Sequence, residues 1–235
     1  MTHSRIACIA LLAVVSFTAR GEAQGWTRGE VAAAGAALGA ALLLDRTFDG
    51  TVPDRGGERF ESLGETLNHG GRPGYAVVLL LGAWAGGEIA GEPRVAEAAV
   101  HVGAALAAGG IANGVLKYSV GRLRPNRTDD PLRFRPFSPE NRWQSFPSGH
   151  AVVAFSLAAA VSEEARRPWV TALAYGAASA VAWSRVYDDK HWTSDAVGGA
   201  LVGIAAGRTT VWLLHRRRAA VLAGPGVLGI TLPAR

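Results

Sequence analysis

The sequence predicts an all-α protein, a bundle of about six core helices. Hydrophobic residues make up 49% of the 235 residues and charged residues 18%, which is enough apolar material for a sizeable core. Stretches rich in Ala, Gly and Leu alternate with polar loops, and no alternating strand pattern interrupts them. The 30 glycines, together with many alanines, let helices approach one another closely.

Six apolar stretches are expected to form the helices. In chain order they cover residues 31–44, 75–89, 95–117, 148–166, 169–183 and 193–214. A short helix near 58–67 is expected within a polar segment, and a short strand at 227–232. A basic loop with many prolines, 122–146, separates the third helix from the fourth.

The N-terminus has the pattern of an export signal. Residues 1–23 combine a short positive start, an apolar stretch at 6–15 and a small-x-small cleavage site at 21–23. We expect a cleaved signal peptide followed by one helical domain, 24–235, in a periplasmic or other extracytoplasmic location. An uncleaved anchor or a buried helix is the alternative. The only cysteine, Cys8, lies in this segment, so the mature chain would have no disulfide.

The sequence leaves open whether the bundle is soluble. A spanning helix needs about 20 mostly apolar residues, and the third and sixth stretches are interrupted by Glu97, His101 and Arg208. Two basic groups, 122–142 and 216–218, would also face opposite sides of a membrane, against the positive-inside rule. A soluble exported bundle avoids this conflict and is favoured, with a membrane-embedded or membrane-attached protein as the alternative.

The chain is basic, with 24 Lys and Arg against 19 Asp and Glu. Such a balance suits nucleic acid, an anionic membrane surface or an anionic substrate. No nucleic-acid-binding motif accompanies the basic groups, so nucleic acid is not an expected partner.

Three short segments carry chemically reactive side chains, each at a helix end: 117–125, 146–150 and 184–195. Because consecutive helices alternate in direction, the ends of the third and fifth helices meet the starts of the fourth and sixth. The segments therefore bring two His, one Asp, two Arg, one Lys and a helix N-terminus to one end of the bundle. The active site is expected there.

This set of side chains suits a tetrahedral anion, whose oxygens Arg and Lys bind. Ser148 is a candidate N-cap, and Gly149 leaves the free N–H groups of the helix start open to an anion. His191 and Asp195 are four residues apart and share a face if the sixth helix already begins there. The carboxylate would then orient the imidazole, leaving His150 to protonate a leaving oxygen.

The segments resemble the signature of the type 2 phosphatidic acid phosphatase (PAP2) and vanadium haloperoxidase-like superfamily, K-x6-R-P, P-S-G-H and S-R-x5-H-x3-D. Every fixed position is present in this chain, within residues 95–214: Lys117, Arg124, Pro125, Pro147, Ser148, Gly149, His150, Ser184, Arg185, His191 and Asp195. The resemblance implies a bacterial-type exported acid phosphatase. Asp189 and Lys190 stand where soluble members often carry G-V, which weakens an assignment to the soluble nonspecific enzymes.

The resemblance also implies a role for each matched residue. Lys117, Arg124 and Arg185 would bind phosphate oxygens, and Ser148 and the Gly149 N–H would add hydrogen bonds. No metal and no cofactor are implied.

For the catalytic steps, the resemblance implies that His191 attacks phosphorus and is oriented by Asp195. His150 would act as general acid and then as base for water. The expected reaction is hydrolysis of phosphate monoesters or pyrophosphates, on a lipid or a small soluble ester. A vanadium-dependent haloperoxidase and a non-catalytic headgroup-binding envelope protein are the alternatives.

The remaining polar residues are expected to be structural. His69 and His101 match no segment. The other loop arginines are expected to be solvated charges that attract anions: Arg122, Arg127, Arg133, Arg135 and Arg142. Four aromatic residues, Trp143, Phe146, Tyr187 and Trp192, line a substrate entrance or pack the loop, and the sequence does not separate these two possibilities.

Overall fold

The computed structural model describes residues 26–45 and 71–222. The expected signal peptide (1–23), short helix (58–67) and strand (227–232) lie outside them. The described residues form six α-helices: α2 (Arg28–Asp45), α4 (Pro73–Ala90), α5 (Pro93–Val120), α6 (Gly149–Ala165), α7 (Pro168–Tyr187) and α8 (Thr193–Leu222). Two short 3₁₀ helices lie in the α5–α6 loop, and this part of the chain contains no strand. The all-α prediction is confirmed.

Proline and glycine define several helix ends. Pro73, Pro93 and Pro168 open α4, α5 and α7, where a fixed φ suits the first turn and the missing N–H costs nothing. Gly91 and Gly121 close α4 and α5 in the left-handed conformation, with φ of 69° and 60°. Helices α4 and α5 extend a few residues beyond the expected stretches, 75–89 and 95–117, because these caps lie outside them.

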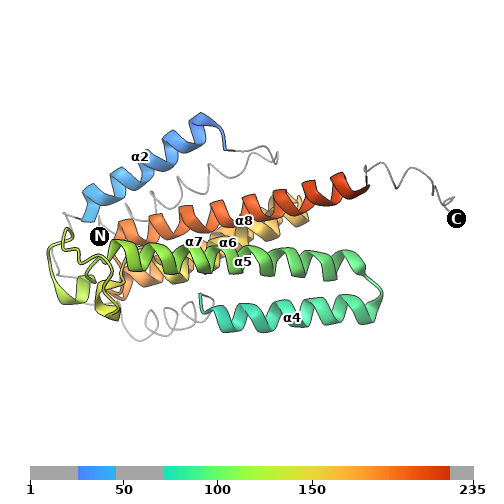
Figure 1. The fold of residues 1–235 in the computed structure, drawn as a ribbon, viewed down its shortest axis with the longest axis horizontal. Helices are drawn as coiled ribbons and strands as arrows, with labels where there is room; N and C mark the ends of the chain where they lie inside the picture. The colour runs from blue at the N-terminus through green and yellow to red at the C-terminus, as the bar shows by residue number, and fades with distance from the viewer. Residues whose placement is uncertain (1–25, 46–70, 223–235) are drawn as a thin grey trace, which may run out of the picture.

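The helices run roughly along one long axis, with α8 crossing the centre of the bundle (Figure 1). Helix α8 packs against α6, α5 and α2. Its contact with α6 is very close, because Gly199, Gly203 and Gly207 face that helix. A Cβ atom at Gly203 would lie 2.6 Å from the carbonyl oxygen of Val152. The expectation that small residues bring helices together is confirmed for this pair.

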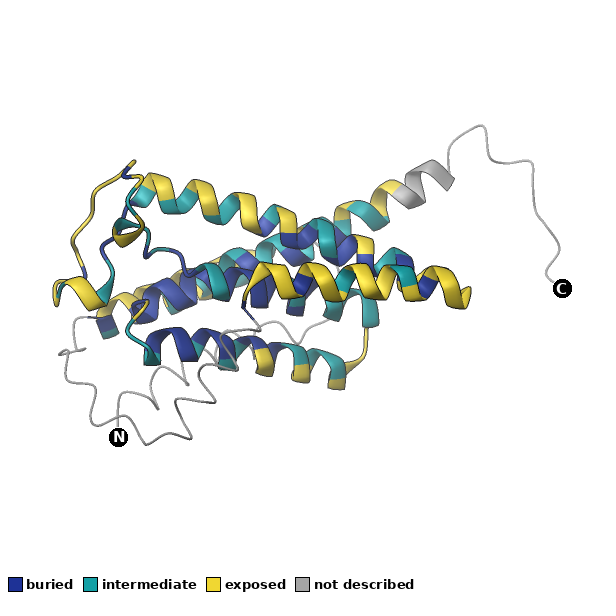
Figure 2. Ribbon diagram, turned by 90° about the horizontal axis from the view of Figure 1, so that it is seen from below, coloured by how far each residue is buried: buried dark blue, intermediate teal, exposed yellow. Residues whose placement is uncertain are grey.

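Burial is concentrated in the inner helices, and the outer ones carry exposed residues (Figure 2). The largest cluster of buried apolar side chains is built mainly by α6, α7 and α8, around Phe155, Tyr175 and Ile204. Helix α4 differs, because its only buried residues are Ala76 and Gly87. Its exposed large apolar side chains are Tyr75, Val77, Val78, Leu79, Leu81, Trp84 and Ile89.

Among the described residues, three helices are long and apolar enough to cross a membrane: α4, α5 and the Thr193–Arg217 part of α8. Only 11% of α4 is buried inside the protein, and an exposed apolar surface of this size marks a contact with lipid or another protein. The chain is therefore membrane-associated, and the favoured interpretation of a soluble bundle is replaced by its alternative.

The sequence interpretation failed because it counted polar residues without knowing their partners. His101 Nδ1 lies 2.7 Å from Glu164 Oε1, and Arg208 pairs with Glu30 at 3.0 Å and Glu163 at 3.5 Å. These polar side chains face other helices of the bundle, which is where a spanning helix tolerates them.

Candidate active site

The three sequence segments meet at one end of the bundle, where the α5–α6 loop folds over the helix ends (Figure 1). Gly121 allows this fold because its left-handed conformation turns the chain directly after α5. Two segments of the loop, 121–123 and 133–135, are joined by backbone hydrogen bonds. Arg135 N donates to Gly121 O at 2.6 Å and Leu123 N to Arg133 O at 3.0 Å. The basic loop thus has a defined structure.

The N-terminus of α6 is part of the site. Ser148 occupies the N-cap position with extended φ and ψ, but its hydroxyl makes no capping hydrogen bond. Ser148 N donates to Asp195 O at 2.9 Å, which joins α6 to α8. A Cβ atom at Gly149 would lie 3.3 Å from Asn113 Nδ2 and 3.7 Å from Lys117 Cε. Lys117 therefore lies beside the helix start.

Two positive side chains at the site have no carboxylate partner among the described residues. Lys117 Nζ donates to Gln144 O at 2.5 Å. Arg124 is held by Asn141, through O at 3.2 Å and Oδ1 at 2.8 Å, and by Lys190 O at 3.0 Å. Their charge stays available for an anion. Arg185, in the last turn of α7, pairs with Asp188 at 3.3 Å.

His191 lies between α7 and α8, and its Nδ1 is 3.6 Å from Asp195 Oδ2. Helix α8 begins only at Thr193, so the two residues meet across the helix start and not on one helix face. Asp195 Oδ2 accepts from the Trp192 N–H at 2.9 Å, the carboxylate half of a capping box. Because Nδ1 faces the carboxylate, Nε2 is the nitrogen left to meet a substrate.

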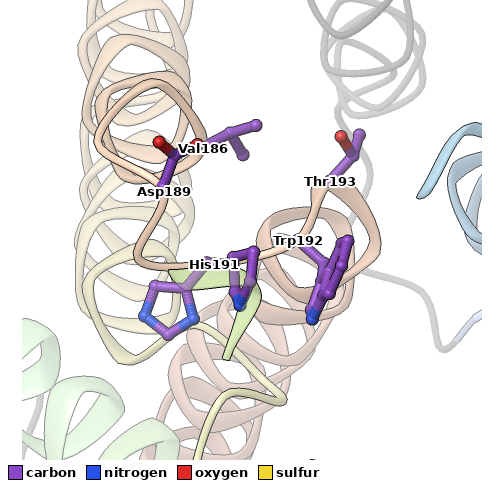
Figure 3. A pocket seen from close by; sticks show the side chains of 6 residues that line it. Val186, Asp189, His191, Trp192 and Thr193 are labelled. Atoms are coloured by element: carbon purple, nitrogen blue, oxygen red, sulfur yellow. The ribbon is translucent and has the colours of Figure 1, made fainter. Parts of the chain in front are cut away.

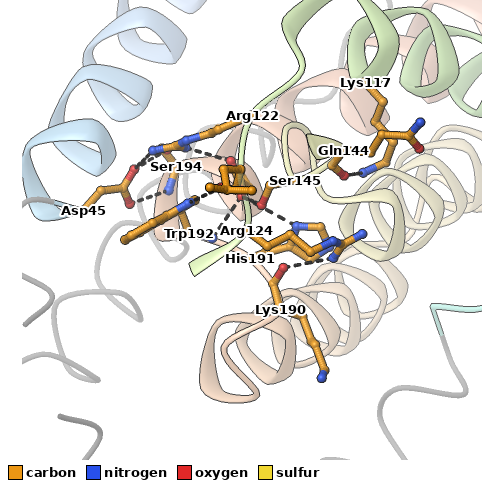
Figure 4. A network of polar contacts seen from close by, with 12 residues as sticks. Asp45, Lys117, Arg122, Arg124, Gln144, Ser145, Lys190, His191, Trp192 and Ser194 are labelled. Atoms are coloured by element: carbon orange, nitrogen blue, oxygen red, sulfur yellow. Dashed lines mark hydrogen bonds and ion pairs between the residues drawn. The ribbon is translucent and has the colours of Figure 1, made fainter. Parts of the chain in front are cut away.

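The sequence interpretation missed a buried network around Arg122, Asp45 and Ser194 (Figure 4), which also holds Asp195. Arg122 is 1% exposed. Its guanidinium donates to Asp195 Oδ1 at 2.7 Å, Asp45 Oδ2 at 2.9 Å and Ser194 Oγ at 2.6 Å. Ser145 Oγ donates to Asp195 Oδ2 at 2.5 Å. The expectation that Arg122 is a solvated loop charge was wrong, because the loop folds this side chain beneath the site.

One signal in the sequence pointed to this network. Asp45 directly follows the first apolar stretch, 31–44, and a carboxylate at a helix C-terminus opposes the helix dipole. The structure gives the reason, since Asp45 is 1% exposed and pairs with Arg122.

The sequence interpretation also missed Arg72 as a positive neighbour of His150. Arg72 precedes α4 beside Gly71, where a Cβ atom would lie 2.6 Å from the ring of His150.

Both histidines favour the neutral form. Burial, with smaller contributions from the charges of Lys117 and Arg124, lowers the pKa of His191 to about 4 against the opposing effect of Asp195. Burial likewise lowers the pKa of His150 to about 4, assisted by positive neighbours that include Arg185. A bound phosphate would offset these positive charges and raise the pKa of His150.

Several polar atoms here are buried and have no hydrogen-bond partner within residues 26–45 and 71–222: Asn113 Oδ1, Ser148 Oγ and His150 Nε2. Leaving a buried polar group unpaired costs about 1–3 kcal/mol. Their concentration at one helix start, next to Lys117 and Arg124, indicates a binding site for a polar ligand.

A small pocket opens beside His191 (Figure 3). Its lining residues come from the end of α7, the start of α8 and the basic loop: Pro125, Val186, Asp189, His191, Trp192 and Thr193. Trp192 is itself 4% exposed, and its Nε1 donates to Leu123 O at 2.9 Å. The Arg122 guanidinium stacks on its ring at 5.3 Å. Of the two interpretations of Trp192, packing of the loop is the one favoured.

The comparisons with known proteins agree with the motifs. The family model of the PAP2 superfamily matches residues 98–219, about half of the chain. The lipid A 1-phosphatase of Porphyromonas gingivalis is 37% identical over 99 residues, 41% of this chain and 19% of that protein. The lipid A 4'-phosphatase of Bacteroides thetaiotaomicron is 29% identical over 107 residues, 44% of this chain and 48% of that protein. The chain thus aligns with at most about half of either relative. No solved structure matches it significantly.

Proposed function

Because the chain belongs to the PAP2 superfamily, we propose that it hydrolyses the phosphate monoester of a membrane lipid through a phosphohistidine on His191. The observation that carries this proposal is the group of unpaired buried atoms at the start of α6. Ser148 Oγ and His150 Nε2 lie there beside the positive charges of Lys117 and Arg124. Pure anion binding needs the positive charges only, whereas two buried histidines suit proton and phosphoryl transfer.

In the first step His191 Nε2 attacks phosphorus, and the bond from phosphorus to the ester oxygen breaks. His150 gives its proton to that oxygen, so the alcohol leaves neutral. In the second step water attacks the phosphohistidine, and the now neutral His150 takes a proton from it. Inorganic phosphate leaves, and His191 returns to its starting form. Asp195 stabilises the positive charge that His191 carries while phosphorylated.

The phosphate of a lipid fits the position of the site better than a small soluble ester. The site lies at one end of helices that are long and apolar enough to cross a membrane. If these helices span a bilayer, their ends lie at the level of the lipid headgroups. The two relatives named as lipid A phosphatases support the same substrate class.

The test uses purified protein in detergent with chelator present. Lipid A, phosphatidate and para-nitrophenyl phosphate are the substrates, and phosphate release and trapped phosphoenzyme are the measurements. We expect release from a lipid substrate without metal, and an acid-labile, base-stable label. His191→Ala should abolish both. Lys190→Ala is the matched control, because this exposed neighbour contributes only its backbone oxygen to Arg124. A label that persists in His191→Ala refutes the assignment of the nucleophile.

For the location, we propose that the site faces the extracytoplasmic side. Arg216 and Arg217 lie on the far part of α8, and basic residues favour the cytoplasm. Glu30 binds Arg208 at 3.0 Å, so α2 begins toward that same end. The opposite topology follows if a signal peptide is cleaved and α2 crosses the membrane. Cleavage would leave the start of α2 outside the cytoplasm, together with the Arg216 end of α8.

Cysteine labelling separates the two topologies. Cys8 is the only cysteine, so Cys8→Ser allows single cysteines to be introduced by Leu132→Cys near the site and Arg217→Cys at the far end. A membrane-impermeant maleimide on intact cells should label the first variant only. Labelling of the Arg217→Cys variant alone would show the opposite topology and contradict the proposal that the site faces the extracytoplasmic side.

A further inference from the structure

A second polar cluster lies at the end of the bundle opposite the site. It joins three helices through His101 on α5, Glu164 on α6 and His215 on α8. Glu164 Oε1 lies 2.7 Å from His101 Nδ1 and 3.1 Å from His215 Nε2. All three potential ligand atoms lie within 4.8 Å of one another. His101 and Lys117 are separated along α5 by about 24 Å, at 1.5 Å per residue, so this cluster is distinct from the active site.

We propose that this cluster is a zinc site. Two imidazoles and one carboxylate are a ligand set that zinc accepts, whereas magnesium and calcium prefer oxygen ligands. Ligand atoms on a tetrahedral zinc ion stand about 3.3 Å apart, because each is about 2.0–2.2 Å from the metal. The two separations in the cluster, 2.7 and 3.1 Å, are close to this value. Small side-chain shifts would therefore admit the ion.

The surroundings of the cluster fit a metal site. Glu97 Oε1 lies 3.9 Å from His101 Nε2, the nitrogen that stays free when Nδ1 binds zinc. A carboxylate in this position orients a ligating histidine. The side chains of His101 and Glu164 are 11% and 17% exposed, but that of His215 is 34% exposed. The more open side at His215 provides an entry path and room for water as a fourth ligand.

Zinc here would be a structural clamp and would take no part in hydrolysis. It would tie the far ends of α5, α6 and α8 together, since each helix supplies one ligand. An ion that binds only the folded state raises its stability in proportion to the logarithm of the zinc concentration over Kd. The sequence did not reveal this site, because its ligands are spread from residue 101 to residue 215 and follow no local spacing.

The experiment uses the full chain without a histidine tag, purified in detergent and stripped with chelator. Zinc is then added, unbound metal is removed by dialysis, and bound zinc is counted by mass spectrometry. Thermal unfolding is measured with and without zinc. We expect about one zinc ion per chain and a higher Tm with zinc, and no comparable binding of magnesium. Glu164→Gln and His215→Ala should lose both effects and keep phosphatase activity in chelator.

Two variants sharpen the result. Glu163→Gln is the matched control, because this neighbouring carboxylate pairs with Arg208 and not with the histidines. It should bind zinc as the wild type does. Glu97→Gln removes no ligand and should weaken zinc affinity about 10–100-fold, which keeps the proposal testable if His215→Ala does not fold. Absence of zinc from the wild type, or zinc retained by Glu164→Gln and His215→Ala, would overturn it.

Discussion

Arg122→Met tests whether the buried network supports the active site. Methionine keeps much of the side-chain volume but removes the charge that holds Asp45 and Asp195, which are 1% and 0% exposed. Removing one member of a buried ion pair costs about 3–5 kcal/mol, because its partner stays buried without compensation. For a chain of this size each kcal/mol lowers Tm by about 2–4 °C. The expected loss is therefore about 6–20 °C.

The loss of stability caused by Arg122→Met should depend on pH. Burial already raises the pKa of Asp45, and loss of Arg122 raises it further. A carboxylate whose pKa is raised in the folded state lowers stability at every pH at which the same carboxylate is ionised in the unfolded chain. The deficit should therefore be full near neutral pH and shrink as the pH falls toward the unfolded pKa of about 4.

The assay is thermal unfolding in detergent over a pH series, combined with steady-state kinetics. Asp195 is held less firmly in the variant, so kcat should fall more than KM rises. Arg133→Met is the control, because this exposed loop arginine should change stability by no more than about 0.5 kcal/mol. If Arg122→Met and Arg133→Met melt within about 2 °C of each other, which corresponds to less than about 1 kcal/mol, the network does not stabilise the site.

Three further predictions concern the site and its supporting helices. Phosphate binding near neutral pH should take up protons, because the anion raises the pKa of His150 from about 4; calorimetry in buffers of different ionisation enthalpy measures this, and an equal heat in all buffers would contradict it. Gly203→Val should lower stability by about 1–3 kcal/mol through overpacking, whereas Gly176→Val, where nothing lies within 4 Å, should not lower stability in the same unfolding assay, because valine favours a helix slightly more than glycine does. Ser148→Ala should raise KM without the loss of about 1 kcal/mol that an N-cap serine usually gives, because its hydroxyl caps nothing; a Tm loss with unchanged KM would refute this.

Much of the fold was predictable because its determinants are local. Apolar stretches bounded by Pro73, Pro93, Gly91 and Gly121 define helices whatever they pack against. Helix parity then indicated that the three motifs meet at one end. The motif residues were recognised from their resemblance to the family signature, and the structure shows Lys117 beside the start of α6 and His191 facing Asp195.

The membrane assignment was not predictable in the same way. The polar residues Glu97, His101 and Arg208 reduced the apparent length of the apolar stretches. Their partners on other helices explain how helices that are long and apolar enough to span a membrane carry them. The exposure of the apolar side chains of α4 is also a property of packing. The same residues would suit a buried helix, since composition does not distinguish a helix inside a protein from one that faces lipid.

The sequence by itself indicated the six helices, the family and the candidate phosphate-binding residues, because each of these can be found from short segments of the chain. The tertiary structure alone decided which charges are paired. Arg122 and Arg124 are two residues apart in one loop, yet Arg122 is buried between Asp45 and Asp195. The Arg124 side chain bonds, within the described part of the chain, to Asn141 and Lys190 and to no carboxylate. Nothing in their local sequence shows which of the two pairs with buried carboxylates. The energy of a charge depends on the burial and partners that distant parts of the chain provide.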